Sequence, residues 1–221
     1  MMTIYTAITG NYDLLKEQPK PPQSGLNYEA FLDREIVSPT WKVKPATSQF
    51  PHPCLNAKYH KILSHISFPD SEITLWIDGC IQIPNITPIL DLAKCYLADS
   101  DLAVFAHSER YCLYQEAAFC IQRRKDDPKA ILRQVFHYTQ KGYPANDGLA
   151  ECTILLRRHT KQVREFNELW WNEILTGSFR DQISFPYVVR QTGIKVNYIP
   201  GNVRDGSLFL RRKHLLKYRR I

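Results

Sequence analysis

Two kinds of apolar pattern follow one another along this chain of 221 residues. Short continuous apolar runs, such as 73–77 and 102–106, are bounded by turn residues and are typical of buried strands. Between them, apolar residues recur every three or four positions, which predicts helices with one buried face. The predicted strands cover residues 4–8, 28–33, 41–44, 73–77, 102–106, 151–156 and 195–199. The predicted helices cover 54–66, 88–98, 111–126 and 128–142, a long segment from Thr160 to Gly177, and a last helix opened by Ser178–Gln182.

This order predicts a single α/β domain with a mostly parallel, Rossmann-like central sheet flanked by helices. The length suits one domain, and the apolar content of 44% suffices for a sizeable core. We expect Thr87 and Asp127 to cap helices, because short polar side chains accept hydrogen bonds from the first free backbone N–H groups.

The helix predicted over 54–66 carries a second pattern beside its apolar stripe. Lys58, Lys61 and His65 lie three and four positions apart, so they share another face of the helix. Two lysines one turn apart can bind a diphosphate as point charges. The alternative is that these side chains are simply the solvent-exposed side of the helix.

Carboxylates stand where several predicted strands end or helices begin. Asp78 ends the run Leu75–Trp76–Ile77, and Asp33, Glu151 and Asp181 hold comparable positions. In open α/β sheets, ligands bind beyond the carboxyl ends of the strands, so these acids are candidates for one functional edge. Two alternatives stay open: Asp78–Gly79 is also a turn signal, and an acid at a helix start is favoured by the helix dipole. His107, after the strand at 102–106, is either a site residue or a core histidine.

The net charge of +7 is confined to one segment. Residues 207–221 contain six Lys and Arg residues and no acid, which leaves 7 − 6 = +1 for residues 1–206. A nearly neutral body argues against a nucleic-acid partner, which needs a basic face. We therefore divide the chain into a domain, 1–206, and a basic amphipathic tail, 207–221. The tail suits an anionic membrane surface; the alternative is a helix that packs its leucines on the domain.

Nothing in the sequence predicts export or membrane insertion. No apolar run approaches the ~20 residues that span a bilayer, and the first five residues do not have the pattern of a secretory signal. The six cysteines are scattered without a Cys-x-x-Cys pair, so we expect free thiols in a reducing compartment and no zinc site. The expected location is the cytoplasm, with peripheral contact at the inner face of the membrane.

An ordered set of segments over residues 5–185 resembles a known family. The segments are Tyr5–Ala7, Gly10–Asp13, Ala57–Leu63, Trp76–Gly79, His107–Arg110, Tyr114–Glu116, Gly142–Pro144, Gly148–Glu151, Trp170–Ile174 and Arg180–Phe185. They are similar to a glycosyltransferase-like family, long treated as a domain of unknown function, that includes plant mucilage hexosyltransferases and bacterial surface-polysaccharide proteins. The resemblance implies a GT-A-like, nucleotide-sugar-binding domain.

The resemblance also implies roles for individual residues. The candidate cofactor-binding residues are Thr6, Gly10, Tyr12, Asp33, Lys58, Lys61, His107, Arg180 and Gln182. Among these, Thr6, Gly10 and Tyr12 would cradle the nucleotide, Asp33 would lie near its base or ribose, and the two lysines would face the diphosphate. The segment Arg180–Asp181–Gln182 resembles a helix-start motif that lies near the acceptor sugar in GT-A enzymes.

A divalent cation, Mn²⁺ or Mg²⁺, is implied in the same way. Asp78 would take the place of the Asp-x-Asp metal motif, with His214 as the late histidine that completes the site. The chain departs from that motif because Trp76 and Cys80 stand where a second acid is expected.

The implied reaction explains why such residues are needed. Glycosyl transfer expels a nucleoside diphosphate, whose charge a metal ion, Lys or Arg must neutralise. An inverting enzyme also needs a group that takes the proton of the acceptor, for which we choose Asp181 first and Glu151 second. We expect a glycosyltransferase that uses a nucleotide-sugar donor and a surface glycan or glycolipid acceptor, as in polysaccharide or lipopolysaccharide biosynthesis. The alternatives are an inactive sugar- or lipid-binding module of the same fold and a metal-dependent phosphoester hydrolase.

Overall fold

The computed structural model describes residues 1–20, 25–206 and 208–215, and the statements below concern these residues. The strands are β1 (Met2–Ile8), β2 (Leu26–Leu32), β3 (Lys42–Pro45), β4 (Ile73–Ile77), β5 (Ile81–Gln82), β6 (Leu102–Ala106), β7 (Ala150–Arg158), β8 (Val196–Ile199) and β9 (Leu210–Arg211). The helices are α1 (Pro53–Ile62), α2 (Ser64–Ser67), α3 (Thr87–Tyr96), α4 (Leu113–Gln122), α5 (Pro128–Gln140), α6 (Lys161–Thr176) and α7 (Asp181–Thr192). The predicted strands and helices are present in the predicted order, except that the helix predicted over 54–66 is divided at Leu63 into α1 and α2.

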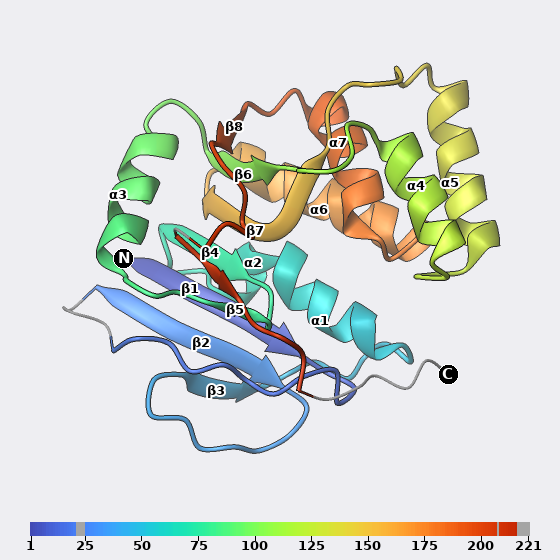
Figure 1. Cartoon of the computed structure of the whole chain (residues 1–221). Coiled ribbons are helices and arrows are strands. Elements are labelled where there is room, and N and C mark those ends of the chain that lie inside the picture. Colours follow the sequence, from blue (N-terminus) through green and yellow to red (C-terminus); the bar gives the residue numbers. More distant parts are fainter. Residues whose placement is uncertain (21–24, 207, 216–221) are drawn as a thin grey trace.

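The main sheet has seven strands in the order β3-β2-β1-β4-β7-β6-β8 (Figure 1). All neighbours pair in parallel except β7, which is antiparallel to both β4 and β6. This confirms the predicted α/β class with a mostly parallel sheet. Because β7 runs the opposite way, its first residues lie at the edge where β1, β4 and β6 end. The reversal therefore brings Glu151, near the start of β7, to the same edge as Asp78, which follows β4.

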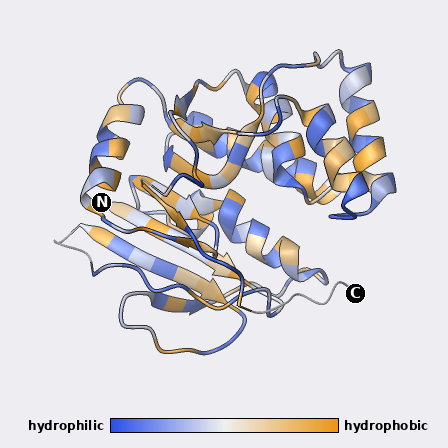
Figure 2. Cartoon of the chain, in the orientation of Figure 1, coloured by the Kyte–Doolittle hydropathy of each residue, from blue (hydrophilic) through white to orange (hydrophobic). Residues whose placement is uncertain are grey.

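Each face of the sheet is covered by its own hydrophobic layer. Successive strand residues point to opposite faces, so Tyr5 and Trp76 pack with α1 and α4–α7, whereas Ile4 and Leu75 pack with α3 and the chain near Phe209. Figure 2 shows the same division, with apolar residues along the strands and polar residues on the outer turns of the helices.

The helix ends follow the expected chemistry, with one correction. The Asp127 side chain accepts a hydrogen bond from the backbone N–H of Lys129 at 3.0 Å and so caps α5. Thr87, predicted as a cap, is instead the first residue of α3. The N–H of Thr87 donates to the side chain of Asn85, 3.1 Å away, two residues earlier.

Residues 208–215 contain the short strand β9 and no helix. Strand β9 pairs antiparallel with β5. The fully buried ring of Phe209 lies edge-on to the ring of Phe105, with 5.9 Å between the ring centres. The alternative of a helix over 207–221 is therefore wrong for Leu210–Arg211, and residues 216–221 lie outside the described part of the chain. None of the described helices has the length and apolar composition needed to cross a bilayer. Membrane contact by the tail stays a prediction.

Candidate functional site

The start of α7 brings a buried carboxylate to the two lysines of α1. The Asp181 Oδ2 atom lies 2.5 Å from Lys58 Nζ and 2.7 Å from Lys61 Nζ. Lys61 and Asp181 are each only 3% exposed. The alternative of a solvent-exposed lysine face is therefore wrong for Lys61, and the predicted convergence of α1 with the Arg180–Gln182 segment is observed.

Lys61 also joins this group to the end of β4. Its ammonium lies 3.1 Å from Asp78 Oδ1, and the indole N–H of Trp76 donates to the same oxygen at 2.7 Å. The residues that follow Asp78 form a turn, because the carbonyl of Asp78 accepts a hydrogen bond from the N–H of Ile81 at 2.8 Å. Asp78 thus begins a turn, as the Asp-Gly signal indicates, and its carboxylate also faces Lys61. Its role in a functional site stays a prediction.

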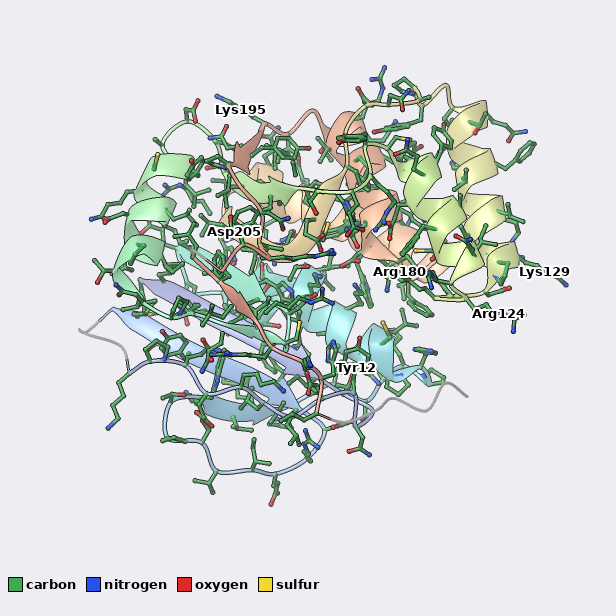
Figure 3. All side chains as sticks on the ribbon, in the orientation of Figure 1. Tyr12, Arg124, Lys129, Arg180, Lys195 and Asp205 are labelled. Carbon is green, nitrogen blue, oxygen red and sulfur yellow. The ribbon has the colours of Figure 1, made fainter. Side chains whose placement is uncertain are left out.

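A third cation stands beside these acids. Arg180 is the residue immediately before α7, and Figure 3 shows its side chain near the ends of α4 and α5 and above α1. Burial alone would lower the pKa of Arg180, but Asp181, Cys120 and Glu116 together outweigh it and raise that pKa. We call Lys58, Lys61, Arg180, Asp78 and Asp181 the ionic cluster. With three cations and two carboxylates, it carries 3 − 2 = +1 charge.

The electrostatics favour the charged forms of Asp181 and Lys61. Burial alone would raise the pKa of Asp181, but Lys58, Lys61 and Arg180 outweigh it and hold that pKa well below its usual range. Burial would likewise lower the pKa of Lys61, but Asp181 and Asp78 raise it above its usual value. A carboxylate held this strongly in its charged form has little affinity for a proton at neutral pH.

The loop after β1 lies against the start of α1. Gly10 has a φ of +67°, and its N–H donates to the Asp33 carboxylate at the end of β2. A Cβ atom at Gly10 would lie 2.6 Å from Pro53 Cβ, so both the backbone angle and the close approach require glycine. The Thr9 hydroxyl closes the same contact by donating to the Pro53 carbonyl at 2.7 Å. Gly10 and Asp33 are thus brought together, and the nucleotide-binding roles that the resemblance implies for them stay predictions.

Tyr12 and Thr6 connect this loop to the ionic cluster. Burial and the charge of Asp78 raise the pKa of Tyr12, while its ring remains 49% exposed. The Thr6 hydroxyl is buried and finds no hydrogen-bond partner among the described residues. It lies beneath Gly79, where an added Cβ would be 3.9 Å from the Thr6 Oγ1 atom and only 2.7 Å from Ile8 Cγ1.

A second polar group, centred on Glu151, occupies the same edge of the sheet. Glu151 Oε2 lies 3.7 Å from His107 Nε2 and 3.5 Å from a guanidinium nitrogen of Arg204. The other oxygen of Glu151, Oε1, accepts a hydrogen bond from the Thr153 hydroxyl at 2.5 Å. His107 Nδ1 accepts hydrogen bonds from two backbone N–H groups, and burial lowers its pKa. Gln182 donates to the carbonyl of Ala150 at 3.2 Å, which ties the start of α7 to the start of β7.

Comparison with known proteins identifies the family. The profile of the TOD1/MUCI70, glycosyltransferase-like domain family matches residues 23–205, more than four-fifths of the chain. The chain belongs to this family. The resemblance inferred from the sequence motifs is thereby confirmed.

Two curated relatives come from Arabidopsis thaliana. One, a probable hexosyltransferase named MUCI70, is 30% identical over 152 residues, which cover 65% of this chain and 26% of that protein. The other, alkaline ceramidase TOD1, is 25% identical over 159 residues, covering 66% of this chain and 34% of that protein. The chain thus spans between a quarter and about a third of the curated relatives it matches.

One solved structure among the similar ones is a glycosyltransferase involved in glycosylation of the major capsid of PBCV-1. It is 10% identical, and the match covers 95% of this chain and 92% of that one with a TM-score of 0.48. The two backbones are thus only loosely similar, and no role is drawn from this match.

The side chains of this TOD1/MUCI70 family member do not fit a protein-held divalent cation well. One oxygen of Asp78 is already engaged by Trp76 and Lys61. His214 pairs with Asp13, its Nδ1 atom lying 2.7 Å from Asp13 Oδ2, and packs edge-on to Tyr12. Within the described residues, no three His, Cys, Asp or Glu side chains group so that they could hold a metal ion. Metal binding by Asp78 and His214 stays a prediction, and no chemical step below uses a metal.

Sequence reasoning missed Arg157, which is fully buried in β7. Its guanidinium donates to the carbonyls of Lys61, at 2.6 Å, and Ile62, at 3.0 Å. The Tyr5 hydroxyl donates to the same Lys61 carbonyl at 2.9 Å. These bonds satisfy carbonyls at the end of α1, which otherwise have no partner within the helix. They fix the backbone of Lys61, while its ammonium lies between Asp78 and Asp181.

Proposed function

We propose that this chain transfers a sugar from a nucleotide-sugar donor to a glycan or glycolipid acceptor. The observation that carries the proposal is the ionic cluster, which places Lys58, Lys61 and Arg180 at the ligand-binding edge of the sheet. Membership of the TOD1/MUCI70 family and the similarity to a probable hexosyltransferase support it.

The leaving group explains the cations. When the bond between sugar and diphosphate breaks, negative charge develops on the diphosphate, and prearranged cations stabilise it. In the proposed complex, Lys58, Lys61 and Arg180 face that charge, and Asp78 and Asp181 hold the two ammonium groups in position. The nucleoside lies along the loop after β1, near Tyr12, with Thr6 and Asp33 beside it.

The proton of the acceptor hydroxyl needs a base, and we assign this role to Glu151 rather than to Asp181. Three cations hold the pKa of Asp181 far below its usual range, so its carboxylate is a weak base. Glu151 lies near the start of β7 and has none of the three cluster cations as an ion-pair partner among the described residues; His107 and Arg204 lie at its second oxygen. In this assignment Asp181 positions the lysines and Glu151 accepts the proton.

A hydrolytic function is the second candidate, because one relative is named an alkaline ceramidase. It would use the same edge of the sheet to cleave a sphingolipid amide instead of transferring a sugar. An inactive sugar-binding module is the third.

A direct test separates these candidates. The purified chain is incubated with a panel of nucleotide sugars, with and without Mn²⁺, and melting temperature, donor consumption and product formation are recorded; a parallel incubation contains ceramide. Transfer predicts that at least one donor raises the melting temperature and is consumed. Lys61→Met should abolish both effects, whereas Lys94→Met, at an ammonium whose side chain is 80% exposed on α3, should preserve them.

Each of the other possible results supports a different candidate function or refutes the proposal. Donor binding without turnover across acceptors would support the binding module. Release of a fatty acid from ceramide without donor binding would support the hydrolase. If no nucleotide sugar or nucleoside diphosphate shifts the melting temperature, the proposal is wrong.

We also propose a cytoplasmic location with peripheral contact between the basic tail and an anionic membrane. Because Phe209 is part of the core, the test removes only residues 216–221. This truncation should reduce binding to phosphatidylserine vesicles at low salt and leave the melting temperature unchanged. Unchanged vesicle binding would refute the membrane role.

A further inference from the structure

We propose that a groove beside the start of α4 binds a sugar ring of the acceptor; this inference rests on the proposed function and adds a substrate subsite to it. The groove has a volume of about 580 Å³. Its lining includes Glu109, Arg110, Tyr111, Gln115, Phe119 and Gln122. One exposed aromatic ring thus stands among charged groups and side-chain amides.

The lining suits carbohydrate. A sugar ring has apolar C–H faces and a rim of hydroxyl groups, so it is held by an aromatic face together with a few directional polar groups. Tyr111 is 66% exposed and supplies the aromatic face. The faces of Phe119 are less accessible, because Arg110 lies 4.0 Å and Lys125 4.5 Å from its ring centre. The amides of Gln115 and Gln122 lie beside the groove as donors and acceptors for hydroxyl groups.

The groove is held in shape before any ligand arrives. The N–H of Tyr111 donates to the side-chain oxygen of Gln115 at 2.8 Å, which fixes the turn before α4. Arg110 is anchored from behind, because its Nε donates at 2.6 Å to the fully buried carboxylate of Glu116. A prearranged site loses less conformational entropy on binding than a flexible one.

Continuous contacts lead from the groove to the proposed base. A terminal nitrogen of Arg110 lies 2.7 Å from His107 Nε2, which is 3.7 Å from Glu151. A second route runs from Glu109 through Arg204, at 2.9 Å, to Glu151, at 3.5 Å. A sugar seated on Tyr111 would therefore be connected to Glu151 through these side chains. This continuity favours an acceptor sugar over an unrelated ligand.

The test uses carbohydrate binding, which needs no turnover. The full chain is applied to a printed array of neutral and acidic oligosaccharides, and a bound oligosaccharide is then titrated in solution by calorimetry. We expect Tyr111→Ala and Gln115→Ala to weaken that binding at least tenfold and Tyr111→Phe to retain it. The matched control is Phe136→Ala, which removes an aromatic ring of similar exposure, 63%, from α5, away from the groove. This control should bind like the unchanged protein.

The outcomes separate this inference from the proposed function. Binding of no oligosaccharide, or equal losses in Tyr111→Ala and Phe136→Ala, would overturn the groove assignment, even if uridine diphosphate still bound the protein. Oligosaccharide binding that depends on Tyr111 but comes with no binding of any nucleoside diphosphate would keep the groove as a sugar site and refute the transferase proposal. Groove-dependent binding of ceramide micelles instead of oligosaccharides would overturn the carbohydrate assignment.

Discussion

Replacing Asp181 with asparagine should strongly destabilise the fold. The substitution keeps the shape of the side chain but removes one of two carboxylates in the ionic cluster, which changes its charge from +1 to 3 − 1 = +2. Asp181 is 3% exposed, and the remaining acid, Asp78, has a side chain that is 37% exposed and contacts only Lys61 of the two lysines. Lys58 would therefore lose its carboxylate partner.

The expected loss of unfolding free energy follows from leaving one buried charge without its ion-pair partner. Removing one partner of a buried ion pair typically destabilises a protein by about 3–5 kcal/mol. Since domains unfold with about 5–15 kcal/mol, this is a large share of the total stability. For a chain of this size each kcal/mol corresponds to roughly 2–4 °C in the melting temperature, so Asp181→Asn should melt roughly 6–20 °C lower.

The assay is urea unfolding of both proteins at pH 7 and at pH 3.5. Because the pKa of Asp181 is lowered on folding, its stabilising effect is complete above the unfolded pKa of about 3.9, begins to decline below it, and is lost fully only as pH falls through the lowered folded pKa. The difference between variant and parent should therefore shrink at pH 3.5. Asp91→Asn, at an exposed pair with Lys94, serves as the control and should change little. A loss below about 1 kcal/mol at pH 7 in Asp181→Asn would refute the reasoning.

Three further predictions concern other parts of the fold. Arg157→Met should lower stability by about 2 kcal/mol or more in urea unfolding, because it leaves the buried carbonyl of Lys61 with one fewer donor; no loss would contradict the capping role. Gly79→Ala should cost about 1–3 kcal/mol, since the new Cβ would meet Ile8 at 2.7 Å; a neutral effect in thermal unfolding would show that this contact relaxes. Burial, and then Lys44, lowers the pKa of His60 to about 4, so the folded state resists protonation. Stability should fall by up to about 3 kcal/mol as pH drops from 6.5 to 4, and His60→Gln should make this decline shallower in unfolding curves measured across that range.

The sequence was sufficient for the order of strands and helices because those signals are local. Apolar runs and helical spacing depend on neighbours a few residues apart, and the spacing of Lys58 and Lys61 by three residues put both on one face of α1. The position of Asp78 after a buried strand was enough to predict that it lies at the edge of the sheet where the parallel strands end. The reversal of β7, which brings Glu151 to that edge, was not predicted.

The rest depended on contacts between distant parts of the chain. Arg157 follows an apolar run and lies one residue beyond the strand predicted over 151–156, whereas β7 continues to Arg158 and Arg157 is fully buried. Its partners lie about 95 residues earlier, and no local pattern signals them. The same holds for His214, whose partner Asp13 is 201 residues away, and for the two-residue strands β5 and β9.

The central claim is that the cations of the ionic cluster bind the diphosphate of a nucleotide sugar. Calorimetric titration of uridine diphosphate and guanosine diphosphate into the unchanged protein, Lys58→Met and Lys94→Met tests it most directly. The account predicts saturable binding of at least one nucleotide, weakened tenfold or more in Lys58→Met and unchanged in Lys94→Met. Equal affinity in all three proteins, or no binding to any of them with or without Mn²⁺, would contradict it.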